Sequence, residues 1–117
     1  MILDASIHAT SILEEAALGT AVEDKIFWEL AEQTTQIPFV VFTVADSGPG
    51  TKNGLTEIEV NVRVFGSSIT ASATIAKQLR NAIDSNNTRW RDRGARSGYT
   101  NTDAKEGYIE ITYNFKL

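Results

Sequence analysis

The 117-residue chain contains no cysteine, only two prolines and a single histidine, His8. Without cysteine it can form neither disulfides nor zinc–thiolate sites, and it has no thiolate nucleophile. His8 has no second imidazole with which to bind a metal or relay a proton, so we expect a surface or packing residue. No catalytic triad motif, metal-ligand spacing or dinucleotide fingerprint is present. We therefore expect no enzyme, no catalytic residue, no metal and no cofactor.

Long apolar runs are also missing. No stretch of about 18 apolar residues occurs, and the first residues lack the basic and apolar regions of a secretion signal. We expect neither a membrane span nor a signal peptide. The hydrophobic fraction of 42% and the charged fraction of 22% are typical of a folded chain. The length predicts a single α+β domain over residues 1–117.

The net charge of −4 is unevenly distributed along the chain. Residues 1–50 carry eight acidic residues and one basic residue, which gives −7, whereas residues 51–117 carry ten basic and seven acidic residues, which gives +3. If the two halves form different faces, the molecule has two oppositely charged sides. Such a molecule suits head-to-tail association, in which one face meets the other face of a neighbour.

Hydrophobic periodicity predicts the element order α-β-β-β-α-β-β. The first helix is expected over residues 4–18 with Asp4 as its N-cap, and the second over residues 67–87 with Ser67 or Ser68 as its cap. Turns rather than helices join most strands, so we expect a mainly antiparallel sheet of four to five strands with both helices packed on it. The predicted strands cover residues 25–30, 36–45, 56–65, 88–102 and 107–117.

The stretch DSGPGTKNG, residues 46–54, resembles a phosphate-binding loop only superficially. A strand follows it, whereas phosphate binding of this kind needs a helix N-terminus. We predict a flexible loop between two strands, because several of its residues break regular structure. The loop residues singled out are Gly48, Pro49, Gly50, Lys52, Asn53 and Gly54.

Two further patterns predict which side chains face the core. Strand 56–65 alternates apolar and polar residues, so Glu57 and Glu59 should share a solvated face, and the last strand alternates in the same way. The second helix carries an apolar stripe at helical spacing, which should pack on the sheet. The stripe consists of Ile69, Ala73, Ala76, Leu79, Ala82 and Ile83.

The run from residue 25 to 84 resembles the small tail-completion, or tail-terminator (tail-to-head joining), proteins of long-tailed bacteriophages and prophages. The resemblance extends over nearly the whole chain. The matching order is a short helical N-terminus, Lys25-Ile26-Phe27, a polar stretch, Pro38 to Phe42, a turn-rich tip, a Glu-rich strand from Glu57 to Phe65, an alanine-rich helix and a final hairpin. Trp28 stands where such proteins often have proline, a difference that bears on the local turn and not on the fold.

The resemblance implies structural work in a virion rather than catalysis. Members of this family form rings, commonly hexamers, at the head-proximal end of the tail tube, where they end tube growth and join the tail to the head. The implied partners are further copies of the chain, the tail tube protein and the neck, or head–tail connector, proteins. DNA would pass through the lumen without specific binding. The implied location is the virion tail, and the host cytoplasm during assembly.

Four of the eleven basic residues lie in the stretch NTRWRDRGARSGYTN: Arg89, Arg91, Arg93 and Arg96. The strand period places the first three on one sheet face. We favour contacts with a neighbouring subunit or the tail tube, because arginine binds carboxylates with two donors. A mobile hairpin comes second, and contact with DNA in the ring lumen third, since an acidic protein is a poor general DNA binder. The candidate acidic partners are Glu14, Glu15, Glu23 and Asp24.

Two other function classes remain open on the sequence alone. A non-viral binding module could use the arginine-rich hairpin to bind an acidic partner or nucleic acid. An unrecognised small enzyme ranks last, because no residue pattern supports it.

Overall fold

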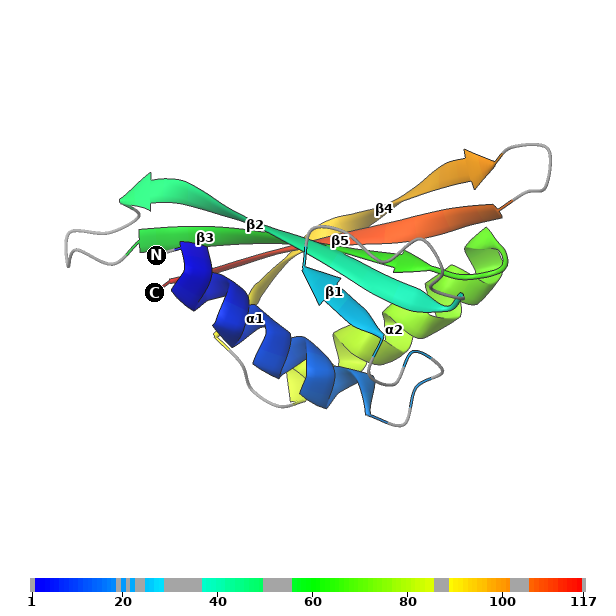
Figure 1. The fold of residues 1–117 in the computed structure, drawn as a ribbon, viewed down its shortest axis with the longest axis horizontal. Helices are drawn as coiled ribbons and strands as arrows, with labels where there is room; N and C mark the ends of the chain where they lie inside the picture. The colour runs from blue at the N-terminus through cyan, green and yellow to red at the C-terminus, as the bar shows by residue number, and fades with distance from the viewer. Residues whose placement is uncertain are drawn as a thin grey trace.

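The computed structural model describes residues 2–18, 20, 22, 25–28, 37–49, 56–85, 89–101 and 106–116. All five strands belong to one sheet with the order β1-β2-β3-β5-β4, and both helices lie on the same face of it (Figure 1). β1 is parallel to β2, and the other three neighbouring pairs are antiparallel. The predicted α+β fold and element order are confirmed. The elements are α1 (Ile2–Ala17), β1 (Ile26–Trp28), β2 (Phe39–Pro49), β3 (Thr56–Phe65), α2 (Ile69–Ser85), β4 (Arg91–Asn101) and β5 (Glu106–Lys116).

Two predicted boundaries are wrong. α1 begins at Ile2, so Asp4 lies inside its first turn and is not the N-cap. The carboxylate of Asp4 is nevertheless near the positive end of the helix dipole. β2 continues through Gly48 and Pro49, which were expected in a flexible loop. Pairing with β3 extends the strand across a register shift between Asp46 and Pro49, and such irregularities accommodate glycine and proline. Gly50, Lys52, Asn53 and Gly54 lie outside the described residues.

The second helix is capped as predicted, and most of its expected apolar stripe packs on the sheet. The Oγ atom of Ser68 accepts a hydrogen bond from the backbone N–H of Ala71 at 3.1 Å, so Ser68 is the cap. Ala73, predicted in the apolar stripe, is exposed. Of the predicted stripe, Ala76, Leu79 and Ile83 are buried, and Ser72 and Ile75 are buried beside them. A polar serine therefore occupies a position that the apolar pattern could not identify.

Ser72 joins α2 to two strand ends. Its Oγ accepts the backbone N–H of Gly66, just after β3, at 2.8 Å. The same atom lies 2.9 Å from two carbonyl oxygens, those of Gly107 in β5 and of Ser68. The single hydroxyl hydrogen of Ser72 can be donated to either of them. Ser72 is fully buried, so these bonds satisfy backbone groups that water cannot reach.

An aromatic cluster closes the core near the start of β4. Trp90 is buried and stacks on Phe115 with a ring separation of 5.4 Å. Its indole Nε1–H donates a 3.1 Å hydrogen bond to Nε2 of His8 in α1. His8 is half-buried and also packs against Phe115, at 4.8 Å. Trp90 thus anchors the arginine-rich segment to the helix layer, and His8 is the packing residue that was expected.

Within the described part of the chain, neither helix has the length and apolarity that crossing a membrane requires.

Replacing Ser72 by alanine should lower the free energy of unfolding by about 1–3 kcal/mol, because two buried backbone groups lose their partner. Thr74→Ala is the matched control, since the hydroxyl of Thr74 is exposed and donates to the carbonyl oxygen of Thr70 within the same helix. Urea unfolding of both variants measures the difference. Equal stabilities would contradict the role given to Ser72.

Acidification should weaken the fold through His8. Burial lowers the pKa of His8, and its Nε2 can accept the Trp90 hydrogen bond only when the ring is neutral. Neutral His8 therefore stabilises the fold fully above the pKa of about 6.5 that it has in the unfolded chain. This stabilisation is lost as the pH falls through the lower pKa of the folded protein. Thermal unfolding between pH 7.5 and 5 should show a steeper loss for the wild type than for His8→Gln, which cannot titrate. Parallel curves would rule out this dependence.

Candidate interaction surface

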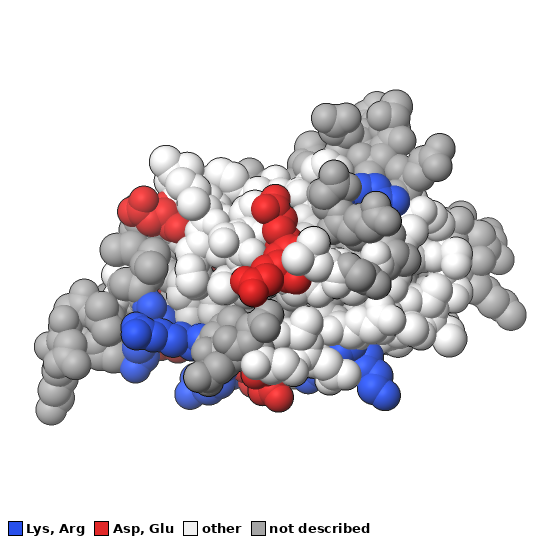
Figure 2. Space-filling view, turned by 90° about the horizontal axis from the view of Figure 1, so that it is seen from below, with Lys and Arg blue, Asp and Glu red and all other residues white. Residues whose placement is uncertain are grey.

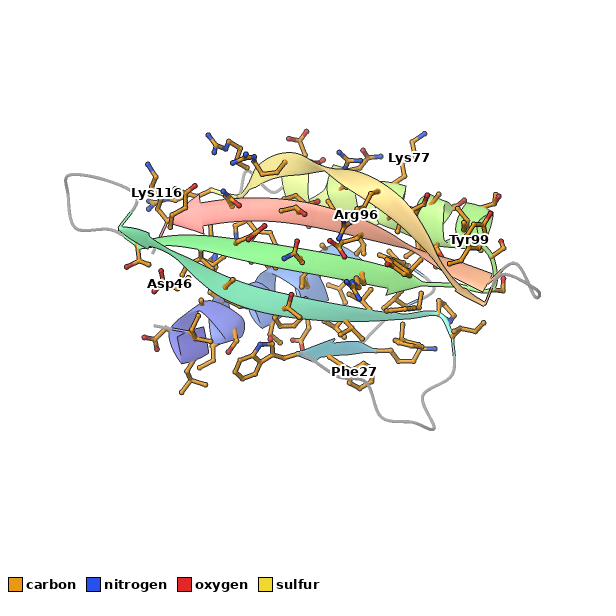
Figure 3. The ribbon with its side chains drawn as sticks, turned by 90° about the horizontal axis from the view of Figure 1, so that it is seen from above. Phe27, Asp46, Lys77, Arg96, Tyr99 and Lys116 are labelled. Atoms are coloured by element: carbon orange, nitrogen blue, oxygen red, sulfur yellow. The ribbon has the colours of Figure 1, made fainter. Side chains whose placement is uncertain are left out.

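The sheet has one face turned away from both helices, which we call the open face (Figure 3). Every second side chain of the central strands points to it, because side chains alternate along a strand. Among the described residues, no helix covers this face. The open face carries Phe39, Val41, Glu57, Glu59, Asn61, Arg63, Phe65, Tyr108, Glu110, Thr112 and Asn114.

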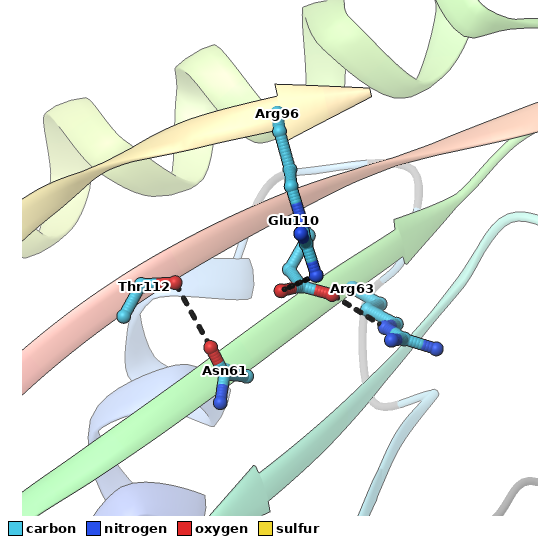
Figure 4. A network of polar contacts seen from close by, with 5 residues as sticks. All are labelled: Asn61, Arg63, Arg96, Glu110 and Thr112. Atoms are coloured by element: carbon cyan, nitrogen blue, oxygen red, sulfur yellow. Dashed lines mark hydrogen bonds and ion pairs between the residues drawn. The ribbon is translucent and has the colours of Figure 1, made fainter. Parts of the chain in front are cut away.

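A buried carboxylate lies at the centre of the open face (Figure 4). Glu110 of β5 is 5% exposed. Its Oε2 accepts a 2.7 Å bond from Nε of Arg63 in β3, and its Oε1 a 3.1 Å bond from Nη2 of Arg96 in β4. Arg63 also lies 5.1 Å from the centre of the Tyr108 ring, at cation–π distance. The two guanidinium groups compensate the buried charge and link three strands.

Polar pairs continue this network along the strands. Thr112 donates to Oδ1 of Asn61 at 2.9 Å, and Asn114 donates to Oε1 of Glu57 at 2.9 Å. Nη2 of Arg91 lies 3.9 Å from the same glutamate oxygen. Glu57 and Glu59 thus lie on the predicted face, but both are half-buried, and Glu57 is hydrogen-bonded. These cross-strand pairs fix the polar side chains between β3 and β5.

An aromatic row crosses one end of the open face. Phe27, Phe39, Phe65 and Tyr108 come from β1, β2, β3 and β5, and all are half-buried. Successive ring centres are 6.4, 5.0 and 5.5 Å apart, and the Phe39 and Phe65 rings are stacked. Sequence reasoning did not find this row or the Glu110 site. The aromatic side chains were visible, but only the strand register brings them together.

A β-bulge arranges the arginines of β4. Arg89 precedes the strand and is exposed, and Arg91 pairs with Asn114 on the open face. The register shifts between Asp92 and Ala95, where Gly94 has a φ of 108° that favours glycine. After the shift Arg96 also faces Glu110. Arg93 lines a shallow hollow of about 420 Å³ with Asn61, Glu59, Arg96 and Glu110.

The proposed acidic partners lie on the other side of the molecule. Glu14 and Glu15 are exposed on α1, in the helix layer, whereas Glu23 and Asp24 lie outside the described residues. The view from the helix side shows acidic side chains in the middle of that face, with most of the visible basic side chains along one border (Figure 2). Glu14 and Glu15 therefore do not meet the open-face arginines within one molecule.

This arrangement can bind a partner through charge and aromatic contact. The described residues contain no group of three or more acidic, histidine or cysteine side chains that could hold a metal ion.

Burial raises the pKa of Tyr113, whose hydroxyl has no hydrogen-bond partner among the described residues. That hydroxyl therefore stays protonated at neutral pH.

The chain matches no protein-family model. It also matches no curated protein. Its fold is similar to that of a chain in the virion of a native gene transfer agent particle, with a TM-score of 0.50. The likeness covers 92% of each chain at 14% sequence identity, so it concerns the fold.

Removing both cations from Glu110 should destabilise the protein. Arg63→Met/Arg96→Met keeps apolar contact but leaves the carboxylate buried and unpaired, at a cost of about 2 kcal/mol, because water reaches part of this site. Adding Glu110→Gln should recover much of the loss. Chemical denaturation of the double and triple variants measures the difference. A triple variant no more stable than the double would show that the ion pairs contribute little.

Proposed function

We propose that this protein is a structural component of a phage-like virion. In this proposal it forms a ring on the head-proximal end of the tail tube, ends tube growth and joins the tail to the head. The observation that carries the proposal is the likeness in fold to a chain of a gene transfer agent virion, over 92% of both chains. The resemblance of the sequence to tail-terminator proteins supports the same role independently.

The charge distribution fits subunits that meet head to tail. A closed ring requires two different surfaces on each subunit, one meeting the other on its neighbour. Exposed acidic residues lie on α1, and arginines lie on β4 and the open face, on opposite sides of the sheet. Arginine–carboxylate contacts between subunits would select the register of the ring.

The interface residues in this proposal are the arginines of the β4 region and the acidic residues of the N-terminal half. Arg96 is already bonded to Glu110 and Arg91 approaches Glu57, so these two contribute less charge to a partner. For Arg89 and Arg93 the described part of the chain shows no ion pair. Arg89 and Arg93 would therefore make the stronger contacts to Glu14, Glu15, Glu23 or Asp24 of a neighbour.

The remaining partners follow from the position of the ring. One rim would contact the tail tube protein and the other the neck proteins of the filled head. DNA would pass through the lumen without specific binding. The neutralisation of Arg96 by Glu110 argues against a nucleic-acid-binding hairpin, because it lowers the positive charge available to phosphate.

Light scattering across protein concentration and salt tests this function. The mass should rise with concentration towards a closed ring near six subunits, and added salt should lower it by screening the charged faces. Arg91→Glu/Arg93→Glu should leave the monomer folded, because exposed charges contribute little to stability, and should weaken assembly.

Electron microscopy of polymerising tail tubes from the same particle gives the decisive result. The protein should bind one tube end and stop elongation there. Tubes that grow to the same length with no density at their ends would contradict the proposed function, whatever the mass of the free protein.

A further inference from the structure

The outer face of α1 carries apolar side chains that the core does not use. Leu3, Ile7 and Leu18 are 62%, 61% and 76% exposed. Leu3, Ile7 and Glu14 lie on one side of the helix at spacings of four and seven residues, and Leu18 follows just after the helix ends. Exposed apolar side chains grouped on one side of a helix, with acidic side chains farther along it, are typical of a surface that contacts a partner.

The open face offers a second surface of complementary composition. The aromatic row supplies half-buried rings at one end, and Arg93 lines the hollow farther along the sheet. Arg93 and Glu14 show no ion pair within the described part of the chain. One surface therefore carries aliphatic groups followed by carboxylates, and the other carries aromatic rings followed by a cation.

The spacing of these groups agrees between the two surfaces. A helix rises 1.5 Å per residue, so Glu14 lies about 10 Å beyond Ile7 and about 16 Å beyond Leu3. A strand rises about 3.3 Å per residue, so Asn61, which borders the hollow with Arg93, lies about 13 Å from Phe65 of the aromatic row. With Ile7 over Phe65 and α1 aligned with β3, Glu14 would therefore reach the hollow that Arg93 lines.

We propose that α1 of one subunit docks on the open face of the next, with Leu3 and Ile7 on the aromatic row and Glu14 at Arg93. The occupant is a second copy of this chain, because the complementary charges and apolar groups are carried by the same molecule. The two surfaces lie on opposite sides of the sheet, so the contact is heterologous, as a ring requires. The inference rests on the proposed function and names its subunit contact.

Pairing of sheet edges between copies is a weaker explanation for association. The outer edge of β4 carries exposed arginines and a bulge, features that oppose strand pairing between molecules. At the other edge, β1 contains only three residues.

Charge reversal tests the contact in trans. Glu14→Arg and Arg93→Glu should each weaken self-association about tenfold, because each places like charges opposite one another. An equimolar mixture should recover the wild-type association, because alternating subunits restore opposite charges at every contact. The double variant Glu14→Arg/Arg93→Glu should recover it as well. Lys77→Glu makes the same charge change as Arg93→Glu on the exposed face of α2, and as the control it should associate normally. Sedimentation velocity compares the association constants of these five samples with that of the wild type.

A separate variant tests the apolar part of the proposed contact. Ile7→Gln should leave the thermal midpoint unchanged, because Ile7 is exposed, and should weaken association. Single variants that associate like the wild type, or a mixture and a double variant that both fail to recover, would overturn the inference. If the wild type forms rings in those cases, the proposed function stands. A wild type that stays monomeric at all concentrations would also overturn this contact. Electron microscopy of polymerising tail tubes then tests the proposed function separately.

Discussion

The buried carboxylate of Glu110 is the constraint on which the open face depends. A charge that is 5% exposed needs close cationic partners, because removal from water is costly. Arg63 and Arg96 supply them from the two neighbouring strands, at 2.7 and 3.1 Å. This network fixes the side chains of β3, β5 and β4 relative to one another, and it decides which arginines remain available to a partner.

The arginine-rich strand is held from both sides of the sheet. On the helix side, Trp90 packs on Phe115 and donates to His8, and Asp92 accepts from Arg80 at 2.8 Å. On the open face, Arg96 binds Glu110. The segment described as β4 is therefore fixed by its neighbours. A strand held in this way suits contact with a partner, because little backbone entropy is lost on binding.

Much of the fold could be predicted because its strands have period-two patterns and its helices have helical ones. The bounds of β3 agree with the prediction, and Ser68 caps α2 as expected. The errors have physical causes. Ser72 takes a core position through hydrogen bonds to distant backbone groups, which an apolar pattern cannot detect. The bulge at Gly94 changes the strand phase, so a strict alternation places Arg96 on the wrong face.

The sequence by itself determined most of the elements, their order, the α+β class and the unequal charge of the two halves, because these depend on local periodicity and composition. Only the tertiary structure decided which residues meet. Glu110 lies 47 residues from Arg63 and 14 from Arg96, and the aromatic row joins four strands. Such contacts depend on strand order and register, which are set by packing between distant segments and leave no local trace in the sequence.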